Sequence, residues 1–208
     1  MTGKFITLEG GEGVGKSTQA RALAEALRAH GLDVVETREP GGSEGAEAIR
    51  RLLLEGSADR WGARAEALLF AAARADHVEK TIRPAIAAGK WVVCDRFLDS
   101  SIAYQGGADG IGGDNIRALH RVGSDGFLPD RTLLLALPSV EATARAAQRD
   151  HGIADRIGGR DATYHVGVAA VFEQLAIAEP GRYRRIDALG SPAALTARLI
   201  AAIGDLLP

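Results

Sequence analysis

The sequence contains a single cysteine, Cys94, so no disulfide bond can form within the chain. A chain without disulfides is typical of a reducing compartment. Cys94 ends the apolar run Trp91-Val92-Val93-Cys94, where a buried structural thiol is expected rather than a reactive one. These features predict a cytoplasmic protein whose chemistry does not use its thiol.

The sequence also lacks a membrane span and a strong excess of either charge. No run approaches the ~18 apolar residues of a transmembrane helix, and the N-terminus carries no secretion signal. The formal net charge is −2 and there are only four lysines, which argues against a basic surface for nucleic acid. With 208 residues, 46% of them hydrophobic, we expect one domain (1–208) with no membrane or nucleic-acid partner.

A phosphate-binding loop follows directly on the first apolar segment. Its residues are Gly10, Gly11, Glu12, Gly13, Val14, Gly15, Lys16, Ser17 and Thr18. They fit the pattern Gly-x-x-x-x-Gly-Lys-Ser, and they lie between an expected strand and an amphipathic helix, as this motif requires. Backbone N–H groups of such a loop surround a polyphosphate, Lys16 adds a positive charge, and the Ser17 hydroxyl is a ligand for Mg²⁺. The motif predicts a protein that binds a nucleoside triphosphate with Mg²⁺.

Short apolar segments alternate with helical patterns along the whole chain. This alternation predicts an α/β fold, a three-layer P-loop NTPase sandwich with a five-stranded parallel sheet and helices on both faces. The expected strands are Lys4–Glu9, Asp33–Thr37, Trp91–Asp95, Thr132–Leu137 and Tyr183–Asp187. The expected helices are Lys16–His30, Ser43–Leu54, Ala63–Ala88, Gly113–Val122, Val140–Arg149, Ala162–Glu179 and Ser191–Leu206.

Ligands of such sheets bind beyond the carboxyl ends of the strands, so the segments after the strands should surround one cleft. Two glycine-rich segments are expected to be loops over it. Tyr104–Gly113 is too rich in glycine for a regular element, and His151–Arg160 combines glycines with Arg156 and Arg160. The second segment (about 150–161) suggests a short mobile lid that grips phosphate, although a solvated surface loop has the same composition.

Three kinds of P-loop protein have to be distinguished. A GTP-dependent switch needs an Asn-Lys-x-Asp motif, but the only asparagine, Asn115, is followed by Ile116. A motor ATPase usually carries a glutamate after the aspartate that ends the third strand. Here Asp95 is followed by Arg96, which suits the gripping of a second phosphate. The pattern favours a kinase for a phosphorylated acceptor.

Further side chains are expected at the same cleft. Arg38 follows the second strand, and Phe70 and Arg74 share one face of a helix, where a ring and a guanidinium could stack on a base and bind its edge. A core phenylalanine with a solvated arginine explains this pair equally well. A polar wall also forms if the segment after Asp95 is helical; it consists of Ser101, Tyr104 and Gln105.

The accumulated motifs resemble the thymidylate kinase (dTMP kinase) family over essentially the whole chain. The resemblance rests on five segments in matching order and spacing. They are Glu9–Thr18, Thr37–Gly42 (TREPGG), Leu69–Arg74 (LFAAAR), Asp95–Gly106 (DRFLDSSIAYQG) and Asp155-Arg156. The P-loop is widespread among nucleotide-binding proteins, whereas the second and fourth segments together are much more specific.

The resemblance implies transfer of a phosphoryl group from ATP to dTMP, giving ADP and dTDP, with Mg²⁺. For dTMP it implies that Phe70 stacks on thymine, that Arg74 binds the edge of the base with Ser101 and Gln105 nearby, and that Tyr104 packs against the deoxyribose. Arg38 and Arg96 would hold the acceptor phosphate, and Glu12 would approach the 3′-hydroxyl.

For the donor side, the resemblance places Asp95 near the metal or its waters. The P-loop has no arginine, so the chain resembles the bacterial subgroup with basic residues in the lid: Arg156 and Arg160 would stabilise the transferring group and Arg149 would lie against adenine. A homodimer through helices like Ala63–Ala88 is also implied. The catalytic set is therefore Lys16, Asp95, Arg96, Arg156 and Arg160.

Two alternatives stay open from the residues alone. One is a related kinase for another nucleoside monophosphate, and the other is a P-loop switch or sensor without an acceptor. For the kinase, we predict no strong general base, because the acceptor phosphate is already anionic at neutral pH. Arginines and Mg²⁺ would then act by positioning and by neutralising charge.

Overall fold

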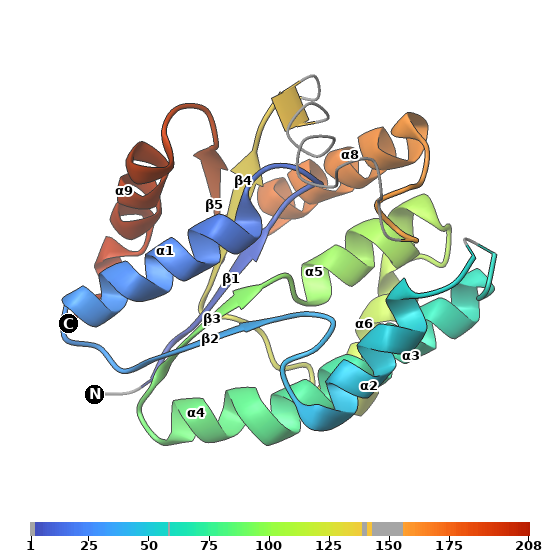
Figure 1. Cartoon of the computed structure of the whole chain (residues 1–208), viewed down its shortest axis with the longest axis horizontal. Coiled ribbons are helices and arrows are strands. Elements are labelled where there is room, and N and C mark those ends of the chain that lie inside the picture. Colours follow the sequence, from blue (N-terminus) through green and yellow to red (C-terminus); the bar gives the residue numbers. More distant parts are fainter. Residues whose placement is uncertain (1–2, 58, 139–140, 143–155) are drawn as a thin grey trace.

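The computed structural model describes residues 3–57, 59–138, 141–142 and 156–208. Its centre is a five-stranded sheet in the order β2-β3-β1-β4-β5, and every pair of neighbouring strands is parallel (Figure 1). The strands are β1 Phe5–Glu9, β2 Val34–Arg38, β3 Trp91–Asp95, β4 Arg131–Ala136 and β5 Tyr183–Asp187. All five expected strands are confirmed to within a residue or so at each end.

Helices cover both faces of the sheet, which confirms the expected three layers (Figure 1). The α-helices are α1 Lys16–Ala29, α2 Glu44–Leu54, α3 Ala63–His77, α4 Arg83–Ala87, α5 Leu98–Ser101, α6 Gly113–Ser124, α8 Ala162–Ala178 and α9 Pro192–Ala202. Two π-helical segments, η1 Val78–Ile82 and η2 Ile102–Ala108, and a 3-10 turn, η3 Gly204–Leu206, complete the regular structure of the described residues.

Side chains of each strand alternate between two hydrophobic cores, because successive residues of a strand point to opposite faces. In β1, Ile6 and Leu8 pack under α1 and α9, whereas Phe5 belongs to the core beneath α3, α6 and α8. In β3, Val93 faces the first core and Cys94 the second. Cys94 is buried, as expected, and burial raises the pKa of its thiol well above the ordinary value.

The expected helix Ala63–Ala88 is a nearly continuous helical run, but its hydrogen-bond pattern changes in the middle. α3 gives way to η1, and α4 follows directly with Pro84 in its first turn. Proline has no N–H to donate to the preceding turn, so the α-helical ladder cannot run through this position unchanged. The π-helical turn accommodates the interruption without breaking the rod.

The expected loop Tyr104–Gly113 is wrong in its first half, because Tyr104–Ala108 belong to the π-helix η2. The glycines here permit close packing of a helix. A Cβ on Gly107 would lie 2.6 Å from Val171 of α8, and one on Gly106 would lie 3.3 Å from the backbone of Gly113. The composition therefore reflects crowding rather than irregular backbone.

Parts of two expectations fall outside the described residues. They are most of the helix Val140–Arg149, including Arg149 itself, and the lid up to Asp155. Of the lid, the structure describes 156–160, which form a turn before α8. Among the described helices, none is both long and apolar enough to cross a membrane.

Candidate active site

The P-loop connects the carboxyl end of β1 to the N-terminus of α1, at the edge of the sheet where ligands bind. Gly10 has φ of 137°, and a Cβ there would lie 2.5 Å from the carbonyl oxygen of Leu135, so only glycine fits this close approach. Gly15, at φ 94°, precedes the first turn of α1, whose N–H groups point toward the loop.

Lys16 is buried at the base of this loop, and its Nζ donates to the carbonyl oxygen of Gly11 at 2.5 Å. Burial and then the neighbouring charge of Arg96 lower the pKa of Lys16 to about 8. The side chain is thus held inside the loop rather than extended into solvent.

Ser17 and Asp95 join the P-loop to the end of β3. The Ser17 hydroxyl donates to Asp95 Oδ2 at 2.5 Å. The other carboxylate oxygen, Asp95 Oδ1, is buried and accepts no hydrogen bond from the described residues. An oxygen pair of this kind, with one lone-pair-rich atom left unsatisfied, has the chemistry of a site for a hard cation.

Arg96 lies next along the chain in an unusual backbone conformation, with φ of 68°. Its Nη1 donates to the carbonyl oxygen of Gly10 and to Ser100 Oγ, both at 3.1 Å. Its Nη2 donates to Glu12 and, at 3.3 Å, to the hydroxyl of Tyr104. Burial opposes the charge, but Tyr104 and Glu12 together raise the pKa of Arg96, so its guanidinium stays cationic.

Glu9 supports this turn from below. Its buried carboxylate accepts from Phe97 N at 2.7 Å and from Ser100 Oγ at 2.6 Å. Burial, followed by the nearby Asp99, raises the pKa of Glu9 to about 8. Glu9, the last residue of β1, therefore fixes the backbone of Phe97, which follows Arg96. It also fixes the side chain of Ser100, which Arg96 contacts.

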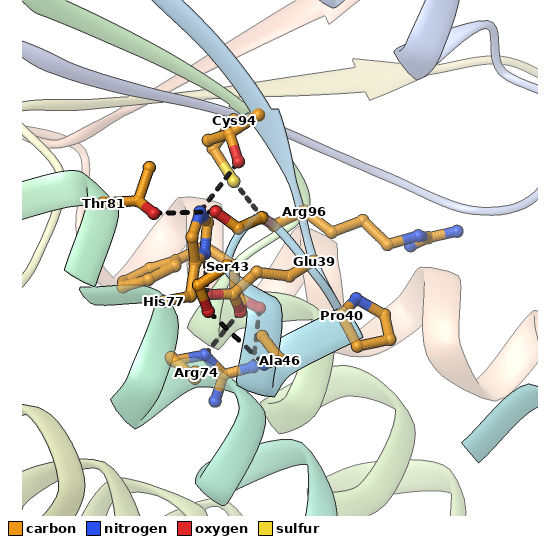
Figure 2. A network of polar contacts seen from close by, with 12 residues as sticks. Glu39, Pro40, Ser43, Ala46, Arg74, His77, Thr81, Cys94 and Arg96 are labelled. Carbon is orange, nitrogen blue, oxygen red and sulfur yellow. Dashed lines mark hydrogen bonds and ion pairs between the residues drawn. The ribbon is translucent and has the colours of Figure 1, made fainter. Parts of the chain in front are cut away.

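Arg74 is held by a buried network with a single carboxylate at its centre. Glu39 accepts from Arg74 Nε at 2.7 Å and pairs with His77 Nδ1 at 3.0 Å; Figure 2 shows both side chains reaching it from α3. Arg74 also donates to Ser101 Oγ at 2.7 Å. Burial alone would raise the pKa of Glu39, but Arg74 and His77 hold it below the ordinary value.

These side chains line one open cleft of about 640 Å³. Phe70 lies on its wall with Arg74, and Ser101, Tyr104 and Gln105 follow along α5 and η2. The P-loop forms the other end, from Glu12 to Thr18 except Val14, which is buried in the core beneath the loop. The structure thus brings the predicted base-binding residues and most of the predicted P-loop residues to the same cavity, whereas Gly10 and Gly11 are not part of its lining.

Arg38 also lines the cleft, but it is exposed, and its Nη2 donates to the two carboxylate oxygens of Glu47 at 3.1 and 3.2 Å. Arg50 lines the cleft beside it and donates to the carbonyl oxygen of Pro40 at 2.6 Å. Arg50 was not predicted, because an arginine on an amphipathic helix normally reads as a solvated side chain.

Arg156 and Arg160 are not gathered around the P-loop in this structure. Arg156 is buried, donates to the carbonyl oxygen of Leu53 at 2.8 Å and is paired with Glu66. Arg160 contacts Glu66 at 3.1 Å and Asp109 at 2.5 Å. Both predicted lid arginines therefore form ion pairs with carboxylates at the base-binding side of the cleft.

Three acidic residues with clear positions in the site were also not predicted to take part in it: Glu9, Glu39 and Glu66. Glu39 lies inside the TREPGG segment, but nothing in its spacing indicates that it would turn inward. Glu9 and Glu66 are fully buried, and a buried carboxylate cannot be recognised from the sequence unless its partner is known.

Comparison with known proteins identifies the chain that carries this cleft. A family model described as thymidylate kinase matches residues 8–199. The chain belongs to this family. It is 70% identical over 208 residues to a thymidylate kinase of Rhizorhabdus wittichii, with full coverage of both chains. It is 48% identical over 195 residues to one of Bradyrhizobium sp. (strain ORS 278), which covers 93% of this chain and 86% of that one.

A solved structure agrees with this assignment. The thymidylate kinase from Ehrlichia chaffeensis superposes with a TM-score of 0.78 at 31% sequence identity, covering 98% of this chain and all of the other. Membership of the thymidylate kinase family makes the chain a nucleoside monophosphate kinase. It transfers a phosphoryl group from ATP to dTMP, a step in the synthesis of dTTP.

Proposed function

We propose that the cleft holds ATP and dTMP end to end, with the triphosphate on the P-loop and the thymine against α3. The observation that carries this arrangement is the continuous lining from Lys16 through Arg96 to Phe70. A single cavity with phosphate ligands at one end and an aromatic ring at the other suits two nucleotides whose phosphates meet in the middle.

The base-binding end rests on Phe70 and Arg74. Phe70 is half-buried on the cleft wall and presents a ring for stacking on a pyrimidine. The hydrogen bonds of Arg74 use Nε and Nη2, and none among the described residues uses Nη1. That nitrogen supplies a donor for a carbonyl group of the base, and Tyr104 packs against the sugar.

The acceptor phosphate is assigned to Arg96 and Arg38. Each is paired with a carboxylate, Glu12 and Glu47 respectively, and a phosphate that carries more charge replaces that partner. Glu12, once it leaves Arg96, would accept a hydrogen bond from the 3′-hydroxyl of dTMP. Binding of the phosphate to Arg96 would therefore release Glu12 to bind the sugar, so the two parts of dTMP would be positioned together.

Phosphoryl transfer at this site requires no general base, because the attacking oxygen of dTMP is already anionic. The difficulty is to bring two polyanions together, and Lys16 and Arg96 supply positive charge on either side of the transferring group. Because both side chains are largely buried, less water screens their attraction to the phosphates.

We also assign Mg²⁺ to the oxygens of Ser17 and Asp95. The buried, unsatisfied Oδ1 of Asp95 and the adjacent hydroxyl fit a cation that takes its other ligands from water and phosphate. When bound, the ion would neutralise charge on the ATP phosphates. Ser17 and Asp95 would orient it, with Asp95 acting either directly or through a bound water.

For the lid, we propose that Arg156 and Arg160 leave Glu66 and stabilise the transferring group. Arg149, which lies outside the described residues, would contact adenine. We further propose one domain over 1–208 and a homodimer through α3. Leu68 of α3 has 56% of its surface exposed, a large apolar side chain on the helix expected at the interface.

The test is a comparison of Phe70→Ala and Arg96→Ala with the unchanged enzyme. Phe70→Ala should raise KM for dTMP while ATP binding, measured by titration calorimetry, stays the same. Arg96→Ala should lower kcat severely with only a small change in ATP affinity. Equal losses of ATP affinity and of transfer in Arg96→Ala would contradict its assignment to the acceptor phosphate.

A further inference from the structure

Glu66 is a fully buried acidic residue on α3, next to the base-binding end of the cleft. Neither the phosphate-binding residues nor the proposed contacts to the base give it a role. Its carboxylate accepts from Gln105 Nε2 at 2.9 Å through Oε1. It also pairs with Arg156 and, at 3.1 and 3.2 Å, with Arg160. Three side chains from two different segments therefore converge on one carboxylate.

The contact with Gln105 fixes which end of the amide faces which way. A carboxylate flanked by two guanidinium groups only accepts hydrogen bonds, so the end of the amide that touches Glu66 has to be the NH₂ group. The carbonyl oxygen is then directed away from Glu66. Among the described residues no donor contacts that oxygen, and Gln105 is part of the cleft lining.

The cleft consequently presents an acceptor from Gln105 and a donor from Arg74 Nη1. Thymine offers the matching pair, an N3–H donor and an O4 acceptor. Cytosine has the reverse pattern, with an unprotonated N3 and an amino group at position 4. A Gln105 amide that is free to rotate could bind either base. An amide held by Glu66 presents only its oxygen and therefore binds only thymine.

We propose that Glu66 is a positioning residue that sets the base specificity of the kinase by fixing the Gln105 amide. Before substrate binds, the same carboxylate also contacts Arg156 and Arg160, so the turn 156–160 and the base-binding wall share one anchor. This inference rests on the proposed placement of thymine beside Phe70 and Arg74.

The experiment measures kcat and KM for dTMP and for dCMP, at saturating ATP, in Glu66→Gln. An amide at 66 can donate or accept, so Gln105 can turn. We expect the dTMP-to-dCMP ratio of kcat/KM to fall by about tenfold or more, mainly through KM, with KM for ATP unchanged. A ratio within twofold of the unchanged enzyme would overturn the proposal.

Two further variants keep the test decisive. Because Glu66→Gln removes a carboxylate that pairs with the buried Arg156, the charge-balanced Glu66→Gln/Arg156→Gln is measured as well. It should show the same loss of selectivity. Asp109→Asn is the matched control: it removes the other carboxylate partner of Arg160 but leaves the Gln105–Glu66 contact, so the ratio should not change.

Failure of the inference can be separated from failure of the proposed site. If Phe70→Ala leaves KM for dTMP unchanged, the base does not lie at Phe70 and both are wrong. If Phe70→Ala raises KM while the folded Glu66 variants keep full selectivity, the base-binding site stands and only the role of Glu66 is refuted.

Discussion

At the scale of single residues, Lys16 is the charge in the P-loop that depends on pH near neutrality. Its pKa is lowered to about 8, so the free enzyme loses this positive charge as the pH rises through that value. We expect kcat/KM for ATP to be level below pH 8 and to fall by about tenfold per pH unit above it. A pH series with initial-rate kinetics measures this.

The matching control for Lys16 is kcat/KM for dTMP at saturating ATP. Bound triphosphate favours the protonated lysine, so this second profile should remain level beyond pH 8. If both kcat/KM profiles fall above pH 8, the group that titrates is not Lys16.

Glu39 gives a prediction on stability. Removal of one partner from a buried ion pair leaves an uncompensated charge, so Glu39→Gln should lower the free energy of unfolding by about 3–5 kcal/mol. The pKa of Glu39 is lowered in the folded state, so its contribution is present above the ordinary carboxyl pKa and is lost as the pH falls through the lowered value.

Denaturant unfolding at neutral and acid pH measures the effect of Glu39. The difference between the two proteins should shrink toward low pH. Glu79→Gln provides the comparison, because that exposed carboxylate pairs with exposed Lys80 and should contribute less than about 1 kcal/mol. A difference between Glu39→Gln and the unchanged enzyme that stays constant with pH would refute the electrostatic explanation.

At the scale of elements, the π-helix η2 is the segment in which crowding determines the residue type. Gly107→Ala would place a Cβ 2.6 Å from Val171, and overpacking of this kind should destabilise the fold by about 1–3 kcal/mol. Gly167→Ala, inside α8, meets no atom within 4 Å and should stabilise by about 0.5–1 kcal/mol. Thermal unfolding distinguishes them, and equal shifts would contradict the packing argument.

The same segment shows what the sequence could and could not predict about elements. The central strands could be predicted because they are short, mainly apolar runs bounded by polar residues, as in Trp91–Asp95. Glycine-rich Tyr104–Ala108 was not, because glycine in a sequence signals either a free backbone or a close neighbour. Only the position of α8 decides between these two.

At the scale of the whole molecule, the proposed dimer can be tested on one surface. Leu68→Glu places a charge on the helix expected at the interface and should shift the mass in solution to that of one chain. Ile177→Glu, an equally apolar site with 78% exposure on α8, should leave the mass unchanged. Light scattering after size-exclusion chromatography measures both, and a mass unaffected by Leu68→Glu would exclude α3.

The sequence predicted the sheet, the cleft and many of the residues that line it, because parallel strands bring their carboxyl ends to one edge. It did not predict how those residues pair. Arg156 and Arg160 could be read as phosphate ligands from composition, yet they contact Glu66, a residue about ninety positions earlier. Such long-range pairings depend on packing that no local pattern records.

Three of the arginines that line the cleft are paired with carboxylates, and this pairing affects how the enzyme binds its substrates. Arg38, Arg74 and Arg96 all carry their own counter-ion before any ligand arrives. An approaching nucleotide therefore feels little net attraction from a distance, and association should depend only weakly on ionic strength. Small anions should bind weakly, because each contact with one of these arginines requires the displacement of its carboxylate partner. High affinity therefore requires a ligand that is large enough to replace several of these carboxylates at once.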